Sequence, residues 1–445
     1  MVEVLKNLLF SLKKNTVCLS AICVAFLLYS GIVPVCSRNP YKGIISPKNV
    51  TTLRGKVISN PVKTAKGAYY RCKMDLESVT GDILTSAGTN LVGIQSTAKG
   101  EVFVYLPAQV VEIHYPGRLY SASSSANTGI LVETGANLLL KARFAQNNST
   151  TSVNETFVPP QFFATEVKFL GFDEDLFGKI AFFRALCRLQ LKRLLYAWGD
   201  SGGLFLALVS GSGEYTDSNL AENFRNSGLA HILALSGMHL SFFAGLASTF
   251  SKFLGRNFSK LFSLNAVLLF VWFAGLTPSL LRALLCCLLG FITSIIGLKP
   301  SNLRILCISF LIHICIVPSD LFQLSFQLSY LALLGILLIS PLLEVVTYNI
   351  MPPYFASGIS SSAGAQVLST PVSAKVFGYF MPGGIVASVI VSPIVSLFLS
   401  VGVLCVLFSL LCPLMIEPLG VIMNLLYNCI NFSVHFFSKI PVLEL

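Results

Sequence analysis

The sequence predicts a polytopic α-helical membrane bundle with an N-terminal anchor helix and an extracytoplasmic all-β domain. Of its 445 residues, 54% are hydrophobic and only 11% are charged, whereas soluble globular chains carry about a quarter charged residues. Long apolar runs fill the chain after residue 229, while short apolar bursts separated by Gly, Pro, Asn and Ser occupy residues 46–143. This composition excludes a purely soluble protein and separates a β-rich segment from a membrane segment.

Residues 1–38 are expected to hold a transmembrane anchor. The run 16–36 has no charge and is long enough for the roughly 20 residues of a spanning helix, and Lys6, Lys13 and Lys14 precede it. A cleaved signal peptide remains the alternative. We favour a retained anchor, because Pro34-Val35-Cys36 lacks the small residues of a cleavage site. The basic flank then predicts a cytoplasmic N-terminus and an extracytoplasmic following domain.

Residues 39–168 are predicted to form a small β-barrel or sandwich of five or six strands, and we favour an OB-like β-barrel. The apolar bursts are rich in β-branched and aromatic residues and are bounded by turn residues, which is typical of short strands. Between residues 38 and 165 the chain has 13 Lys or Arg against 7 Asp or Glu, which suits an anionic partner. The bursts lie at 53–58, 68–76, 102–106, 110–114, 118–121 and 130–133.

Aromatic and basic residues alternate along 68–75, as a platform that stacks bases beside phosphates would require. An ordinary solvated strand is the alternative. The candidate DNA-binding residues of the barrel are Arg54, Lys56, Tyr69, Tyr70, Arg71 and Lys73.

Residues 169–200 are predicted to form a basic amphipathic helix in the membrane interface. Lys179, Arg184, Arg188 and Lys192 recur at helical spacing opposite apolar residues, and either anionic lipid or DNA would suit them. Tyr196 and Trp198 are expected at the headgroup level.

Residues 201–445 are predicted to form the helical bundle, with seven or eight helices besides the anchor. The 41-residue run 376–416 is expected to make at least two passes. Most of the 12 cysteines lie in apolar runs and are interpreted as small hydrophobic residues, so no metal site is predicted. Cys36 and Cys72 are expected outside the membrane, without evidence of pairing.

Several polar residues lie where a bilayer disfavours them. Arg225 precedes the run that contains His231, Ser236 and His239, and a helix would place the two histidines about 80° apart on one broad face, with a break at Ser236. Such residues either form hydrogen bonds between helices or line a pore, and their spacing gives little support to a metal site.

Further candidates follow along the chain. Arg282 stands four residues after Pro278 and either snorkels to the interface or faces water or an anion. Gln323 and Gln327 share one helix face and either bind helices together or line a wet channel. The Ser-, Ala- and Gly-rich stretch 357–370 contains Gln366 and either permits close helix packing or leaves room for a substrate.

Together these segments resemble the competence domain of the ComEC-type DNA-uptake family. Four matches occur in the family's order and span some 150 residues. They are Phe224-Arg225-Asn-Ser-Gly-Leu-Ala-His231-Ile-Leu-Ala-Leu-Ser236-Gly-Met-His239, Pro278-Ser-Leu-Leu-Arg282-Ala283, Pro318-Ser-Asp320-Leu-Phe-Gln-Leu-Ser-Phe326-Gln-Leu-Ser329 and Ala365-Gln366-Val-Leu-Ser-Thr-Pro371.

The resemblance implies an inner-membrane channel that passes single-stranded DNA into the cytoplasm during natural transformation. The OB-like domain would receive DNA outside, delivered by an external DNA-receptor protein, and membrane lipids would surround the bundle. The candidate path residues are Arg225, His231, Ser236, His239, Arg282, Gln323, Gln327 and Gln366.

One departure from the family concerns the C-terminal hydrolase-like domain with a His-x-His-x-Asp-His metal motif. None of the five histidines is so arranged, so the chain is expected to have no catalytic, cofactor-binding or metal-binding residues and to need a separate nuclease for strand degradation. The sequence also lacks a Gly-Lys-Ser or Gly-Lys-Thr phosphate loop, which predicts a separate cytoplasmic helicase or ATPase.

The sequence is also compatible with two other functions. A transporter of a small anion or lipid precursor would use Arg225 and Arg282 as counter-charges. An intramembrane hydrolase would use Ser236 as nucleophile with His239 or His313 as base, although no supporting motif accompanies them.

Overall fold

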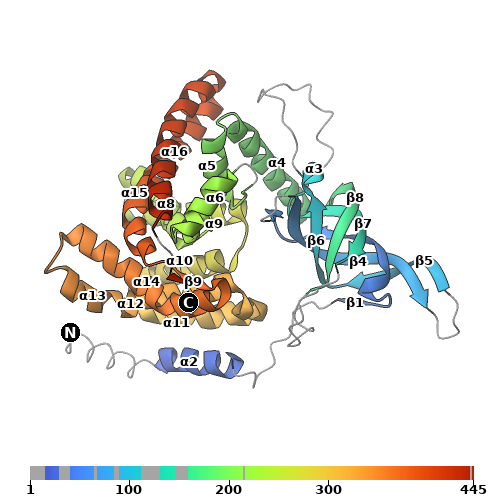
Figure 1. The fold of residues 1–445 in the computed structure, drawn as a ribbon, viewed down its shortest axis with the longest axis horizontal. Coiled ribbons are helices and arrows are strands. Elements are labelled where there is room, and N and C mark those ends of the chain that lie inside the picture. Colours follow the sequence, from blue (N-terminus) through green and yellow to red (C-terminus); the bar gives the residue numbers. More distant parts are fainter. Residues whose placement is uncertain are drawn as a thin grey trace. The chain divides into compact units, whose positions relative to one another are not determined.

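The computed structural model describes residues 16–29, 41–64, 68–84, 90–111, 131–145, 159–213, 216–440 and 443–444, which divide into two compact units. One unit is β-rich and the other is helical (Figure 1). The β-rich N-terminal region and the helical C-terminal part confirm the coarse fold class predicted from the sequence. The predictions for Lys6, Lys13, Lys14, Cys36 and the burst 118–121 lie outside the described residues.

The β-rich unit is built on a closed barrel. Going round it, β2 pairs with β4, β4 with β6, β6 with β8, β8 with β7, and β7 with β2. The β6–β8 pair is parallel and the other four pairs are antiparallel. The strands are β1 (Lys42–Gly43), β2 (Val50–Val57), β3 (Val62–Lys63), β4 (Tyr69–Leu84), β5 (Asn90–Lys99), β6 (Glu101–Pro107), β7 (Ala136–Phe144) and β8 (Gln161–Phe172), with short helices η1 (Pro47–Asn49) and α3 (Ala108–Val111).

Alternation of buried and exposed side chains explains why these segments form strands. Every second residue of β6, namely Val102, Val104 and Leu106, lies in the barrel core, and β7 repeats the pattern. A strand directs successive side chains to opposite faces, so the alternation fills one apolar interior. Cys72 also lies in this core, where burial raises the pKa of its thiol to about 12.

The predicted bursts locate β2, β4 and β6 correctly, whereas the described parts of two others are not strands. Residues 110–111 belong to helix α3, and residues 131–133 form no strand. Strands β5, β7 and β8 were not predicted, because polar residues interrupt their apolar alternation or because they lie beyond the bursts that were counted.

Helix α4 (Leu176–Tyr196) follows the barrel and belongs to the same unit. Asp175 caps it, accepting a hydrogen bond from the Gly178 amide. Its basic face is turned inward: Arg184, Arg188 and Lys192 are all buried.

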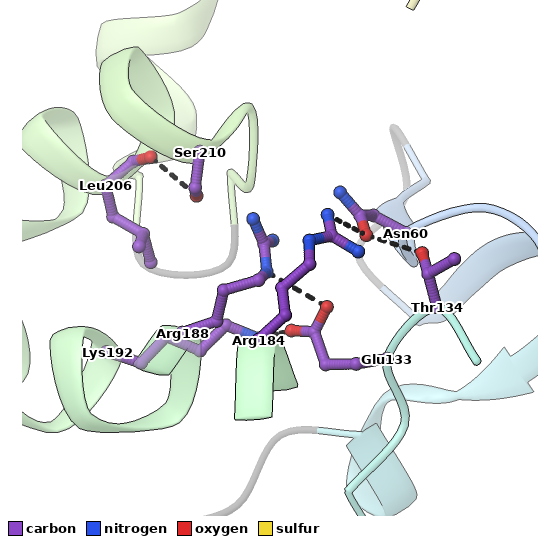
Figure 2. Close-up of polar contacts among 8 residues, drawn as sticks. All are labelled: Asn60, Glu133, Thr134, Arg184, Arg188, Lys192, Leu206 and Ser210. Carbon is purple, nitrogen blue, oxygen red and sulfur yellow. Dashed lines mark hydrogen bonds and ion pairs between the residues drawn. The ribbon is translucent and has the colours of Figure 1, made fainter. Parts of the chain in front are cut away.

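A buried carboxylate accounts for this orientation. Glu133 accepts hydrogen bonds from Arg188 Nε and Lys192 Nζ, each at 3.0 Å, and Arg184 donates to Asn60 at 3.0 Å (Figure 2). Burial by itself raises the pKa of Glu133, but the charges of Arg188 and Lys192, the hydrogen bond from Lys192 and the charge of Arg184 outweigh it. They hold the pKa at about 2.

The structure therefore corrects the predicted faces of this helix. Three of its four predicted lipid- or DNA-facing cations are buried, and the apolar side chains of Phe177, Ile180 and Phe183 are exposed, Phe177 by 76%. Trp198, expected at the headgroup level, is buried as well. Helical spacing revealed two faces, but it did not show that one carboxylate from the barrel would draw the basic face inward.

The helical unit is described by α2 and by the elements from α5 onward. Among the described residues, three segments are long and apolar enough to cross a membrane: α10, α15, and η5 with α16. Helices α12 and α13, bent by 46°, make a fourth if they form one span. The elements are α2 (Thr16–Tyr29), α5 (Asp200–Ser210), α6 (Ser218–Asn226), α7 (Ala230–Leu233), α8 (Gly237–Ser251), η3 (Lys252–Leu254), α9 (Arg256–Ala274), α10 (Pro278–Ile296), α11 (Asn302–Ile316), η4 (Pro318–Phe322), α12 (Leu324–Leu338), α13 (Ser340–Thr347), α14 (Pro353–Phe377), β9 (Tyr379–Phe380), α15 (Gly383–Leu411), η5 (Pro413–Met415), α16 (Ile416–Ser438) and β10 (Leu443–Glu444).

Fewer helices have the length of a span than the apolar runs predicted. Several apolar helices of the described residues have only 10 to 17 residues, and one of them, α11, ends just before Pro318. The run 376–416 was expected to make two passes. This was wrong, because α15 continues unbroken through Pro393 to Leu411. Apolar side chains along α15 and α16 remain exposed, as suits helices that face lipid.

Small residues bring α12 and α14 into close contact. A Cβ atom on Gly335 would overlap the carbonyl oxygen of Gly364, so glycine is required where the two backbones meet. This supports the close-packing interpretation of the Ser-, Ala- and Gly-rich stretch, since small residues allow helices to approach without a driving force from water.

We predict that Glu133→Gln destabilises the β-rich unit by roughly 3 to 5 kcal/mol, because the cations of α4 would remain buried without their carboxylate. Denaturant unfolding of the detergent-solubilised chain, followed by circular dichroism, measures this. The matched control is Glu166→Gln. Glu166 pairs with Lys141 at the surface, with both side chains more than 60% exposed, so its loss should change stability by about 1 kcal/mol or less.

Because of Glu133, we also predict that the free energy of unfolding decreases in acid. The folded-state pKa of this carboxylate, about 2, lies below the ordinary value of 4.5, so its stabilisation is complete above about pH 4.5 and is lost as the pH falls toward 2. In Glu133→Gln the loss of stability over this pH range should be smaller than in the natural chain. A profile identical to that of the natural chain would contradict the role of Glu133.

Candidate functional site

The first candidate site is an aromatic and basic face on the outside of the barrel, formed by β4, β6 and β8. The Tyr105 and Phe163 rings stack with centroids 4.7 Å apart, and Tyr69 meets Phe163 edge-on at 5.2 Å. The guanidinium of Arg71 lies 5.2 Å from the Phe103 ring centroid, and the ammonium of Lys73 lies 5.6 Å from it. We call this set, Tyr69, Arg71, Lys73, Phe103, Tyr105 and Phe163, the aromatic platform.

Three of the six predicted barrel residues belong to this platform: Tyr69, Arg71 and Lys73. Tyr70 points inward and is 0% exposed, because neighbouring residues of a strand face opposite sides. It therefore offers no ring face to a base. Arg54 and Lys56 lie on β2, where they pair with Glu77 and Asp173.

The second candidate site begins with the segment from α6 to α8. Arg225 in α6 and His231 in α7 are exposed, whereas His239 in α8 is buried. The expected single helix face for the two histidines is wrong, because Ala234 and Ser236 are extended between α7 and α8. The predicted break at Ser236 is present.

Ser236 and His239 form a capping box at the start of α8. The Ser236 side chain accepts from the His239 amide, and His239 Nδ1 accepts from the Ser236 amide at 3.3 Å. The two side chains also approach within 3.3 Å. A helix cap thus explains the Ser–His contact that a serine nucleophile would also require, and among the described residues no carboxylate lies within ion-pair distance of His239.

Gln366 in α14 lies beside the turn between α6 and α7. A Cβ atom on Gly384 would lie 3.2 Å from the Ser227 carbonyl oxygen and 3.3 Å from Gln366 Nε2. The close approach of Gly228 and Gly384 brings these groups together. The side-chain oxygen Oε1 of Gln366 is buried and has no partner among the described residues.

Arg282 lies at the centre of a polar group in the bundle. It is only 9% exposed, its Nε donates to Ser329 Oγ at 2.7 Å, and its guanidinium carbon lies 6.0 Å from the Tyr330 ring centroid. Ser329 also contacts Ser279 at 3.1 Å. The Arg282 side chain is therefore held inside the helical unit.

A buried histidine–aspartate pair continues this group. His313 Nε2 lies 3.1 Å from Asp320 Oδ2, and His313 Nδ1 lies 3.3 Å from the Tyr330 hydroxyl. Gln323 donates to the other Asp320 oxygen at 2.6 Å, and Gln327 donates to the Leu321 carbonyl at 3.0 Å. The two glutamines thus hold η4 against the start of α12, which neither of their two sequence interpretations anticipated.

Known proteins show which family has these features. The model of the competence protein family matches residues 208–445, more than half of the chain. This chain belongs to the competence protein family. The resemblance inferred from the four sequence segments is therefore confirmed.

The competence family match contains every candidate residue of the bundle, from Arg225 to Gln366, and it leaves out the barrel and α4. The chain is also similar to ComE operon protein 3 of Bacillus subtilis (strain 168), with 28% identity over 149 residues. That alignment covers 33% of this chain and 19% of the relative. No solved structure matches the chain.

Within this competence domain, sequence reasoning missed the Asp320–His313 pair and Tyr330 as members of the Arg282 group. The available signal for Asp320 was a carboxylate between two apolar helices, α11 and α12. In the barrel, Phe103, Tyr105 and Phe163 were missed because they lie on other strands than Tyr69. Among the described residues, no group of three or more His, Cys, Asp or Glu is placed to hold a metal ion.

We predict that His313→Ala lowers stability by roughly 3 kcal/mol or more, because it leaves the buried Asp320 carboxylate without its partner. Tyr330→Phe removes a hydroxyl but leaves the Asp320–His313 pair intact, and it should lower stability by about 1 kcal/mol. Thermal unfolding in detergent measures both. His435→Ala is the control, since His435 is exposed on α16; an equal loss in H435A and H313A would show that the pair contributes nothing specific.

Proposed function

We propose that this competence protein forms an inner-membrane channel through which single-stranded DNA enters the cytoplasm during natural transformation. The observation that carries the proposal is the buried Arg282 group inside the segment that matches the family. An arginine is retained inside a membrane protein where it meets water, an anion or a conserved partner. The name of the Bacillus subtilis relative, a ComE operon protein, agrees with a role in competence.

The candidate path residues support different parts of this route. Arg225 and His231 are exposed near the start of the domain, where a polyanion would first meet it. Arg282, with Ser236 and His239 near it, would act within the bundle. Gln323 and Gln327 position η4, and we assign them an indirect role in the path. The side-chain amide oxygen of Gln366 is buried without a partner among the described residues, and it would accept a hydrogen bond from a DNA base.

We predict that Arg225→Ala and Arg282→Ala each reduce entry of labelled DNA into the cytoplasm about tenfold or more, while DNA binding at the cell surface is unchanged. A hydrogen bond to a charged group contributes about 1.5 to 3 kcal/mol, and about 1.4 kcal/mol changes a rate tenfold. Nuclease-protected uptake measures entry, and nuclease-sensitive label measures surface binding.

The charge-matched control is Lys299→Ala, since Lys299 is exposed and lies outside the path residues. Uptake should remain normal in this variant. Normal uptake in both arginine variants, with protein levels equal by immunoblot, would remove these residues from the path. A small-anion or lipid-precursor transporter would instead leave transformation unchanged when the whole gene is deleted.

For the barrel, we propose an OB-like domain that binds the incoming strand on the aromatic platform. Five strands closed in the order β2-β4-β6-β8-β7, with one parallel pair, agree with a five-stranded Greek-key barrel of this kind. Exposed rings beside cations suit single strands, because every base has a face to stack and every nucleotide carries a phosphate.

We predict that Phe163→Ala and Tyr105→Ala each weaken binding of a single-stranded oligonucleotide about tenfold, since base stacking on an aromatic ring contributes about 1 to 3 kcal/mol. Arg71→Ala should also reduce the salt dependence, by about 0.7 in the slope of log affinity against log salt. Fluorescence anisotropy with the purified full chain measures both. Lys141→Ala removes the same charge from β7, beyond the platform, and should leave the affinity nearly unchanged; equal weakening would indicate only general charge attraction.

The remaining assignments follow from the proposed route. The N-terminus would be cytoplasmic and the barrel extracytoplasmic, where it would accept DNA from an external receptor protein. The exposed apolar side chains of α4 suit the membrane interface in the present orientation of the helix. A separate cytoplasmic helicase or ATPase would draw the strand inward, and a separate nuclease would degrade its complement.

A further inference from the structure

The N-terminus of α8 meets the guanidinium of Arg282. Helix α8 has 15 residues and begins at Gly237, next to its N-cap Ser236. A Cβ atom on Gly237 would lie only 3.2 Å from Arg282 Nη2. A helix N-terminus carries about half a positive charge, so two positive groups face each other here in a buried place.

No carboxylate of the described residues balances this charge. Arg282 is 91% buried, since its exposed fraction is 9%, and its only hydrogen bond within the described part of the chain runs from Nε to Ser329. Its two terminal nitrogens have no acceptor there, and no Asp or Glu of the described residues lies within ion-pair distance. A buried cation without a counter-charge is strongly unfavourable, which points to an anion from outside the chain.

The first turn of α8 supplies further donors. The capping box uses the Ser236 and His239 amides, and no acceptor within the described residues takes the amides of Gly237 and Met238. Because His239 Nδ1 accepts a backbone hydrogen bond, its Nε2 is assigned the proton. That Nε2 is buried, with His239 0% exposed, and has no partner among the described residues.

The absence of a side chain at Gly237 lets the Arg282 guanidinium lie close to the start of α8. A Cβ there would contact Arg282 Nη2 and, at 3.5 Å, the Ala283 Cβ. Glycine thus lets the guanidinium and the amides of the first turn lie close enough to contact the same anion. The planar fork of arginine together with backbone amides suits the tetrahedral oxyanion of a phosphate group.

We propose that Arg282 and the first turn of α8 bind one phosphodiester group, that of the DNA backbone, in the competence domain. This inference rests on the proposed channel function and deepens it by naming the group that is bound. The site contacts phosphate and no base, so it is independent of sequence. Tyr330 and Ser329 hold the guanidinium in place, and the His313–Asp320 pair orients Tyr330 in turn.

The test uses the full chain in nanodiscs of phosphatidylcholine with dimethyl phosphate as probe, a phosphodiester anion without base or lipid tail. Dimethyl phosphate should raise the unfolding midpoint by about 2 °C or more relative to equal sodium chloride. Arg282→Gln should abolish the rise. Gly237→Ala keeps the charge, but its Cβ would push the guanidinium away from the start of α8. It should therefore abolish the rise as well, whereas Lys299→Gln should retain it.

Absence of a rise in the natural chain, or an equal rise in Gly237→Ala and the natural chain, would overturn the phosphodiester site. Loss of the rise when phosphatidylglycerol is added to the nanodiscs would assign the site to lipid headgroups and would equally overturn it. DNA uptake by Arg282→Ala is measured separately. If uptake falls in this variant but the natural chain does not bind dimethyl phosphate, only the phosphodiester site is contradicted. If the natural chain binds dimethyl phosphate but uptake by the variant is normal, only the channel role of Arg282 is contradicted.

Discussion

A charged group that leaves water must be given partners inside the protein, and both units of this chain are organised by that requirement. In the β-rich unit the group is Glu133, and in the bundle it is Arg282. Removing either charge from solvent is unfavourable by several kcal/mol before any partner is counted. The positions of α4, α8, α10 and α12 are therefore tied to where these two charges find hydrogen bonds.

In the β-rich unit, Glu133 fixes which face of α4 is covered. Once Arg188 and Lys192 bind the carboxylate, the opposite side of the helix must be exposed, and that side is rich in Phe, Ile and Leu. The exposed side of α4 is therefore apolar and suited to contact with lipid. An amphipathic helix whose cations face a protein domain presents hydrophobic anchors to a membrane, whereas the reverse orientation would present only charges.

In the bundle, Arg282 is supported on one side only. Ser329, Tyr330 and the His313–Asp320 pair hold its position without neutralising its charge, and the side toward α8 offers more donors. Such an arrangement is rigid and electropositive at once. A polyanion passing through hydrocarbon needs both properties, because a fixed donor set replaces water on the phosphate without reorganisation.

The sequence by itself determined the membrane class, the family and the strands β2, β4 and β6. Each rests on local information: apolar content, four short segments in order, and alternation within one strand. Only the tertiary structure decided the partners. Glu133 meets cations 55 and 59 residues further along the chain, and Phe163 stacks on Tyr105 because β6 and β8 are parallel neighbours. Periodicity shows which residues share a face of one element, but which faces meet depends on how the whole chain closes. For that reason the burial of Tyr70 could have been read from the alternation of its strand, whereas the inward turn of α4 could not.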